Sequence, residues 1–119
     1  MRKGRKAYLL VTKAGKRIMK KALWTGEEHC VGRDPAQADI VLDNSLVSRR
    51  HCRILWDDEA ECFWVRDISS NGCSVSGKGT LIHDVFVKAE PGEEILITNT
   101  DYKLCLIFEK RRRWMGKDK

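Results

Sequence analysis

The feature that most constrains the fold is a series of short apolar segments separated by turn-forming residues. Within 52–56, Cys52, Ile54 and Trp56 fall on one side of an extended chain, and Arg53 falls on the other. Residues 104–108 repeat this alternation, which is typical of half-buried strands. The segments expected to form strands are Ala7–Thr12, Arg17–Leu23, Glu28–Val31, Asp39–Leu42, His51–Trp56, Cys62–Ile68, Cys73–Ser76, Val85–Val87, Glu94–Thr98 and Lys103–Glu109.

Clusters of Gly, Pro, Asn and Asp lie between these segments and favour turns. Examples are Asp34-Pro35, Asn71-Gly72 and the run 77–80 (Gly-Lys-Gly-Thr), which is read as a hairpin turn. Helical periodicity is weak throughout, although 18–24 could form a short helix. About ten short strands with regular turns predict an all-β sandwich or barrel, whose loops gather at its ends.

The charge of the chain is distributed unevenly. Its 119 residues suit one compact domain, and the net charge is +6. Residues 1–6 carry four positive charges, and 109–119 carry six positive and two negative charges. Because these ends together carry +8, the body over 7–108 has a net charge of −2. An acidic body argues against nucleic acid as the main partner, but the basic ends could contact phosphates weakly, direct the chain to the nucleus or keep it soluble.

No apolar run approaches the roughly 20 residues that span a bilayer, so no membrane partner is expected.

The cysteine pattern points to a reducing intracellular compartment. The five cysteines are odd in number and form no Cys-x-x-Cys pair, which favours free thiols. They are Cys30, Cys52, Cys62, Cys73 and Cys105. Neighbours such as His29 and Cys30 face opposite sides of a strand, and zinc spacing is absent, so no metal or other cofactor is expected.

Three polar motifs fall in predicted loops. Gly32-Arg33 follows a strand, 48–51 (Ser-Arg-Arg-His) precedes one, and 69–72 (Ser-Ser-Asn-Gly) lies between two. A guanidinium, hydroxyls, an amide and turn glycines suit a dianion. Because no acid/base pair or nucleophile accompanies them, the motifs predict phosphate binding without cleavage, and no enzyme is expected.

The ordered set Gly32-Arg33, Ser48-x-x-His51 and Asn71-Gly72 resembles the signature of the forkhead-associated (FHA) domain, and the resemblance extends over about 7–109. It implies an eleven-stranded, two-sheet β-sandwich of the FHA/SMAD-like class that binds phosphothreonine peptides through loops at one end. The resemblance implies five phosphothreonine-binding residues: Arg33, Ser48, Arg49, Ser70 and Asn71.

The same resemblance implies individual roles. Arg33 would pair with the phosphate, and Ser48 would donate its hydroxyl to it. Arg49 and Ser70 occupy positions that often contact the phosphate, and Asn71 would hydrogen-bond the peptide backbone.

The expected supporting residues are Gly32, His51 and Gly72, with His51 buttressing the loop that carries Ser48. Cys73 departs from the family pattern, because the position commonly holds Thr. Leu46 and Val47 lie in a loop that would help to choose the ligand residue three places after the phosphothreonine; alternatively, either side chain could pack in the core.

The resulting organisation is a basic arm over 1–6, an FHA domain over 7–109 and a basic tail over 110–119. In the tail, Trp114 could dock on a partner or a second copy, or be disordered. Because the chain begins at Met1, we expect it to be the N-terminal domain of an adaptor. Its resemblance to the FHA domains of nibrin and the mediator of DNA-damage checkpoint implies a role in nuclear DNA-damage or checkpoint signalling. Homodimerisation is a further expectation. The alternative is a phosphate-independent interaction or dimerisation domain of the same fold.

Overall fold

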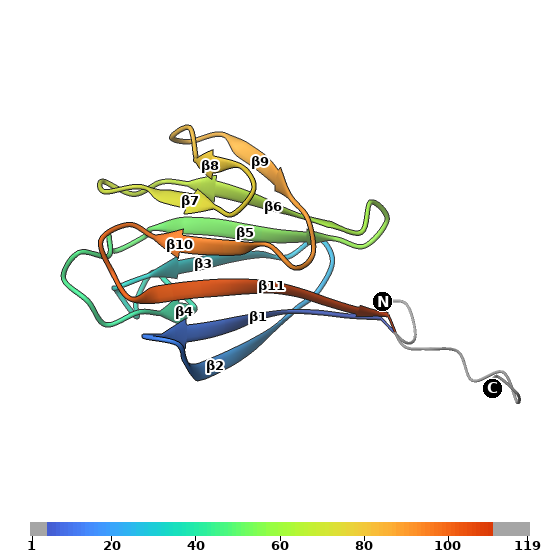
Figure 1. Cartoon of the computed structure of the whole chain (residues 1–119), viewed down its shortest axis with the longest axis horizontal. Coiled ribbons are helices and arrows are strands. Elements are labelled where there is room, and N and C mark those ends of the chain that lie inside the picture. The colour runs from blue at the N-terminus through green and yellow to red at the C-terminus, as the bar shows by residue number, and fades with distance from the viewer. Residues whose placement is uncertain (1–4, 111–119) are drawn as a thin grey trace, which may run out of the picture.

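The computed structural model describes residues 5–110, which fold into strands joined by turns and loops, with no helix in that range (Figure 1). None of these described residues forms a helix that could cross a membrane. The strands are β1 (Arg5–Lys13), β2 (Lys16–Leu23), β3 (Glu28–Gly32), β4 (Ile40–Val41), β5 (Cys52–Asp57), β6 (Cys62–Asp67), β7 (Cys73–Val75), β8 (Gly79–Thr80), β9 (Phe86–Ala89), β10 (Glu94–Ile97) and β11 (Tyr102–Lys110).

The strands form two sheets. The six-stranded sheet has the order β2-β1-β11-β10-β7-β8, and the five-stranded sheet has the order β4-β3-β5-β6-β9. Strands β3 and β4 run parallel, whereas the other neighbouring strands paired within the described chain run antiparallel. The prediction of an all-β, eleven-stranded sandwich is therefore confirmed.

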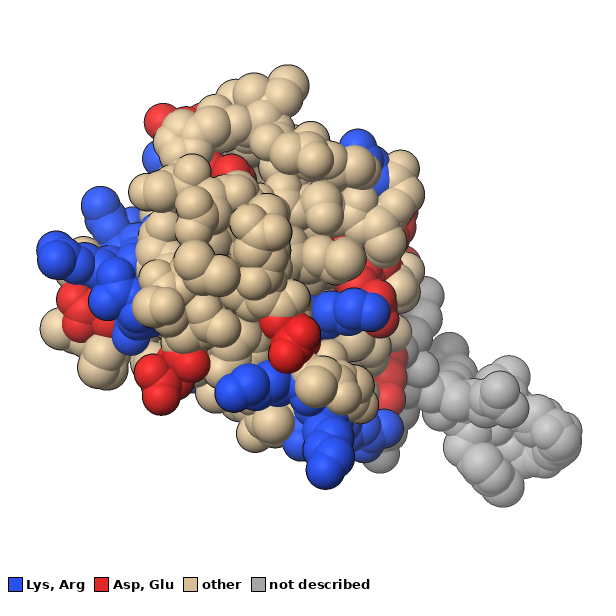
Figure 2. Space-filling view, turned by 60° about the vertical axis from the view of Figure 1, so that its left-hand side comes forward, with Lys and Arg blue, Asp and Glu red and all other residues tan. Residues whose placement is uncertain are grey.

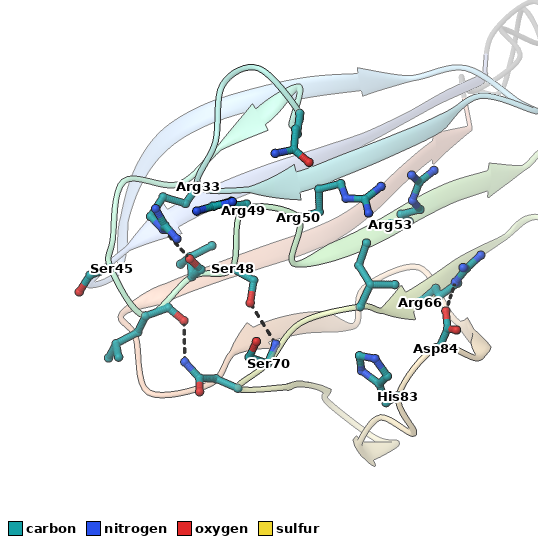
Figure 3. Close-up of a pocket in the computed structure, with 15 residues that line it drawn as sticks. Arg33, Ser45, Ser48, Arg49, Arg50, Arg53, Arg66, Ser70, His83 and Asp84 are labelled. Atoms are coloured by element: carbon teal, nitrogen blue, oxygen red, sulfur yellow. Dashed lines mark hydrogen bonds and ion pairs between the residues drawn. The ribbon is translucent and has the colours of Figure 1, made fainter.

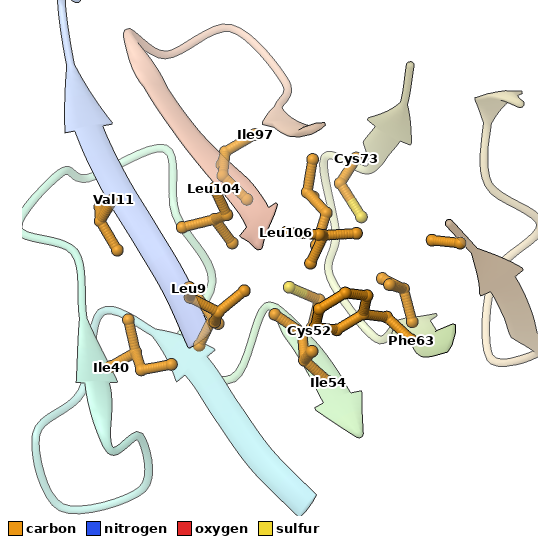
Figure 4. Packing of buried hydrophobic residues seen from close by; sticks show 14 of the residues in the cluster. Leu9, Val11, Ile40, Cys52, Ile54, Phe63, Cys73, Ile97, Leu104 and Leu106 are labelled. Atoms are coloured by element: carbon orange, nitrogen blue, oxygen red, sulfur yellow. The ribbon is translucent and has the colours of Figure 1, made fainter. Parts of the chain in front are cut away.

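The core lies between the sheets and follows the alternation of the sequence. On β5, Cys52, Ile54 and Trp56 point inward and are almost fully buried, while Arg53 stays partly exposed on the outer face. Leu9 and other aliphatic side chains from the facing sheet meet them (Figure 4). Burial of such side chains supplies the main driving force for folding.

The strand expected over Arg17–Leu23 is confirmed as the edge strand β2, whose backbone pairs with β1, so the short helix considered for 18–24 does not form. The hairpin turn expected over 77–80 is present at its start, where the Lys78 N–H donates to the Val75 carbonyl at 2.9 Å, but Gly79–Thr80 form β8 and pair with β7 at Ser74 and Val75. Both β8 residues are exposed, so no hydrophobic alternation in the sequence marks this strand.

All five cysteines are free thiols, as predicted. Cys52, Cys62 and Cys73 are buried, and the other two are partly exposed. Residues 1–4 of the basic arm predicted over 1–6, and residues 111–119 of the tail predicted over 110–119, including Trp114, lie outside the described residues.

Candidate functional site

One open groove of about 730 Å³ lies where the three polar loops come together (Figure 3). The loops that follow β3, precede β5 and join β6 to β7 form part of its wall, and the outer ends of β5 and β6 extend it. The lining residues are Arg33, Gln37, Ser45, Leu46, Val47, Ser48, Arg49, Arg50, Arg53, Arg66, Ile68, Ser70, Asn71, His83 and Asp84. The groove thus unites all five residues for which the sequence predicts ligand contacts.

Arg33 is held by the loop that carries Ser48. Its backbone N–H donates to the Ser48 carbonyl at 2.9 Å, and its side-chain Nε donates to the Val47 carbonyl at 2.9 Å. These bonds fix the side chain while leaving its terminal Nη groups without a hydrogen-bond partner among residues 5–110. The fork of the guanidinium is therefore free to bind an anion.

Gly32 allows the two loops to approach closely. A Cβ atom at this position would overlap the backbone carbonyl of Arg49, which cannot move aside as a flexible side chain could. The backbone N–H of Asp34 also donates to that carbonyl, at 3.3 Å. Only glycine fits here without displacing backbone.

Asp34 closes the turn after Arg33. Its carboxylate accepts hydrogen bonds from the Ala36 N–H at 2.9 Å and from Gln37 Nε2 at 2.7 Å. These two hydrogen bonds lower the pKa of Asp34 below its usual value. The turn that presents Arg33 is thus stabilised by an ionised carboxylate near neutral pH.

Ser48 connects two of the three loops. Its hydroxyl oxygen accepts a hydrogen bond from the Ser70 N–H at 3.0 Å. The Ser48 O–H hydrogen has no acceptor among residues 5–110, so it can be donated to a ligand.

His51 bridges the same two loops from below and is fully buried. Its Nδ1 accepts from the Ser48 N–H at 3.0 Å, and its Nε2 donates to the Gly72 carbonyl at 2.9 Å. This pattern requires the neutral ring with its proton on Nε2. Burial lowers the pKa of His51, which favours that neutral form. Both ring nitrogens are occupied, so neither can serve as a base for a ligand.

Asp67 and Ser69 support the third loop, a role that the sequence reasoning missed. Asp67 Oδ1 accepts from the Ser69 N–H at 3.0 Å and from the Ser69 hydroxyl at 2.5 Å. The Ser69 oxygen in turn accepts from the Gly72 N–H at 2.7 Å. Both side chains are buried. The signal was present as an Asp-x-Ser sequence at the end of a strand, which favours a side-chain-capped turn.

Asn71 lies on the exposed wall of the groove. Its Nδ2 donates to the Leu46 carbonyl at 2.9 Å, which leaves its Oδ1 and second amide hydrogen available. Leu46 is 43% exposed beside it, whereas Val47 is 1% exposed and belongs to the core cluster. Of the two residues in the predicted specificity loop, only Leu46 therefore presents its side chain to a ligand. Cys73, directly after this loop, is buried in the same core.

A comparison with models of protein families identifies the family to which this chain belongs. The family model described as "FHA domain" matches residues 29–98. The chain belongs to the FHA domain family. A search of curated proteins finds no match.

Solved FHA structures share the fold of this FHA domain. The FHA domain of CT664 from Chlamydia trachomatis superposes with a TM-score of 0.74 at 24% identity, covering 86% of this chain and 96% of the other. The MEK1 FHA domain gives a TM-score of 0.73 at 24% identity, covering 85% and 88%. The N-terminal FHA domain of Saccharomyces cerevisiae Rad53p, solved with a phosphothreonine peptide, gives a TM-score of 0.68 at 21% identity, covering 89% and 94%.

Four further groove residues of this FHA domain carry positive charge. Arg49 and Arg50 are exposed and make no side-chain hydrogen bond or ion pair within residues 5–110. Arg53 pairs with Glu28 at 2.7 Å, and Arg66 pairs with Asp84 at 2.8 Å. No sequence motif predicts a role for Arg50, Arg53 or Arg66. Arg53 and Arg66 lie in strands, where an outward basic residue looks like any solvated side chain.

Among the described residues, no group of three or more His, Cys, Asp or Glu side chains could hold a metal ion. The groove offers N–H and O–H donors to an anionic ligand, and FHA domains are generally interaction modules without enzymatic activity.

Proposed function

We propose that this FHA domain binds phosphothreonine peptides of partner proteins in the groove. The observation that carries the proposal is the convergence of three loops whose Arg33, Ser48 and Asn71 side chains keep unused hydrogen-bond donors. Relatives of the same fold support it, because the MEK1 FHA domain was solved with a phosphothreonine peptide of HOP1 and Rad53p with another.

The chemistry of the ligand matches these donors. A phosphothreonine carries a charge of about −1.5 to −2 and three acceptor oxygens. We assign the phosphate to the Arg33 fork and the Ser48 hydroxyl, with Arg49 and Ser70 beside it. Asn71 then reaches the peptide backbone. His51, which is buried behind these loops, cannot act as a general base, because both its ring nitrogens are bonded. The donors of the groove suit the binding of an anion, and we assign a binding function.

The test is calorimetry with a randomised library of phosphothreonine peptides, followed by the best sequence in phosphothreonine, phosphoserine and unphosphorylated forms. Arg33→Ala should weaken binding by at least about a hundredfold, because charge-assisted hydrogen bonds contribute about 1.5–3 kcal/mol each. Arg17→Ala, on the exposed edge strand β2, removes the same charge outside the groove and should leave binding unchanged. Equal affinity for phosphorylated and unphosphorylated peptides would instead support the phosphate-independent alternative.

We further propose that the protein acts as a nuclear adaptor in DNA-damage or checkpoint signalling and forms homodimers. The support is the sequence resemblance to damage-mediator FHA domains, together with the basic composition of the two ends. Imaging of the tagged protein before and after DNA damage tests the location, and sedimentation at micromolar concentration tests the dimer. A cytoplasmic distribution unchanged by damage, or a monomer throughout, contradicts the respective proposal.

A further inference from the structure

The groove does not end at the phosphate-binding loops but continues along a row of arginines. Figure 3 shows Arg33, Arg49, Arg50 and Arg53 following one another along one side of the groove, with Arg66 beyond them beside Asp84. Figure 2, in which the loop end comes forward, shows basic side chains gathered at its left edge. The far part of the row, formed by the last three of these residues, lies beyond the donors assigned to a phosphothreonine.

Two of these arginines stand directly opposite each other. In the register of β5 and β6, Arg53 faces Arg66 across the strand pair. Like charges in directly opposed positions are unfavourable in a sheet. Glu28 and Asp84 each offset one of them. This pairing makes the arrangement stable in the free protein.

The ion pairs of Arg53 and Arg66 leave most of the N–H donors of their guanidinium groups unused. Each guanidinium has five N–H donors. Arg53 uses Nη1 for Glu28, and Arg66 uses Nε for Asp84, so four donors on each have no partner within residues 5–110. Arg50 has no side-chain partner within that range at all. All three side chains reach solvent, so these donors are accessible to a ligand.

The charge of the groove exceeds what one phosphate neutralises. Its lining holds five arginines and the carboxylate of Asp84, and Glu28 pairs with Arg53 from outside the lining, so three positive charges remain in excess. A phosphothreonine neutralises about two of them. The remaining excess lies at the far part of the row, where Arg50 has no partner.

We propose that Arg50, Arg53 and Arg66 form a second anion subsite, which takes an acidic or phosphorylated side chain of the same peptide. This inference rests on the proposed function of the groove. Ser48 and Arg53 are five residues apart, so their backbones lie at most about 17 Å apart at 3.3 Å per residue. An extended peptide spans such a distance with about three to five residues. The ligand is therefore a phosphothreonine peptide with a second anionic group three to five positions away.

The experiment is a positional series on one singly phosphorylated peptide that binds the wild-type domain. Each position from five before to five after the phosphothreonine is replaced in turn by alanine, glutamate or phosphoserine, and Kd is measured by calorimetry. We expect one or two positions, three to five residues from the phosphothreonine, at which phosphoserine strengthens binding about tenfold, or about 1.4 kcal/mol. Glutamate should give about threefold at the same positions, which separates an acidic from a doubly phosphorylated ligand by magnitude.

Arg50→Gln and Arg53→Gln should remove most of this gain without weakening the singly phosphorylated peptide more than about twofold. Arg17→Gln is the matched control, because it removes one exposed positive charge from β2 and should preserve the gain. Thermal unfolding of each variant verifies that the domain is folded.

A flat series, or a gain that survives Arg50→Gln and Arg53→Gln combined, overturns the second subsite. Failure of the singly phosphorylated peptide to bind contradicts the proposed function instead. In that case the same library is repeated with doubly phosphorylated peptides, and absence of binding there overturns both proposals.

Discussion

Replacement of His51 by leucine tests how the groove is held together. The substitution keeps a buried side chain of similar size but removes both ring nitrogens. The Ser48 N–H and the Gly72 carbonyl, bonded to His51 at 3.0 and 2.9 Å, then lose their partners. A buried polar group left without a partner costs about 1–3 kcal/mol. Because both groups lie in partly exposed residues, we expect a loss of about 2–4 kcal/mol in the free energy of unfolding.

The assay is urea unfolding followed by tryptophan fluorescence, with thermal unfolding as a second measure. A loss of this size lowers the melting temperature by about 8–16 °C for a domain of this length. His83→Leu is the control, because His83 lines the same groove but its side chain is 61% exposed. That variant should shift the free energy of unfolding by no more than about 0.5 kcal/mol. An unfolding midpoint for His51→Leu equal to that of the wild type would refute the bridging role.

The remaining predictions concern pH, a pair of loop residues and one glycine. The pKa of His51 is lower in the folded than in the unfolded chain, so below about pH 6.5 the unfolded chain binds the extra proton first, and the free energy of unfolding falls as pH decreases towards the folded pKa. The measurement is the difference in the free energy of unfolding between wild type and His51→Leu from about pH 5 to 8. A difference that does not change with pH would contradict the prediction. Leu46→Ala should alter peptide selectivity in a library screen with little change in stability, whereas Val47→Ala should cost about 2 kcal/mol in urea unfolding; equal stability losses would refute the assignment of Val47 to the core. Gly32→Ala should cost about 2–3 kcal/mol, because its Cβ would overlap the Arg49 carbonyl, and a wild-type unfolding midpoint would show that the loops can separate freely.

The alternation of side chains made the sandwich predictable from the sequence. Residues such as Ile54 alternate with polar neighbours because one face of the strand is buried, and this pattern survives in the sequence alone. β8 has no buried face, so its existence depends on pairing with β7, which is a tertiary contact that no local pattern records. The segment at 18–24, which mixes apolar residues with two lysines, was ambiguous for a related reason, since an exposed edge strand and a short helix can have similar compositions.

The site was predictable where a residue's chemistry is tied to a motif, and not where it depends on the neighbouring strand. Arg33 follows a strand and Ser48 precedes one, each within a motif of recognisable spacing, and the structure places both in the groove. Arg53 and Arg66 were missed because their proximity arises only from the register of β5 with β6. Asp67 was missed because its hydrogen bonds to Ser69 depend on the geometry of the turn that follows β6.

The long pairing of β1 with β11 has a consequence for how the domain can be joined to other chains. Arg5 stands opposite Lys110, and the two strands leave the sandwich together, away from the end that carries the groove (Figure 1). A tether or fusion partner attached beyond either strand would start from that remote end and would not obstruct an incoming peptide. Tags for immobilisation can therefore be placed on either side of the domain with the same freedom of access to ligand.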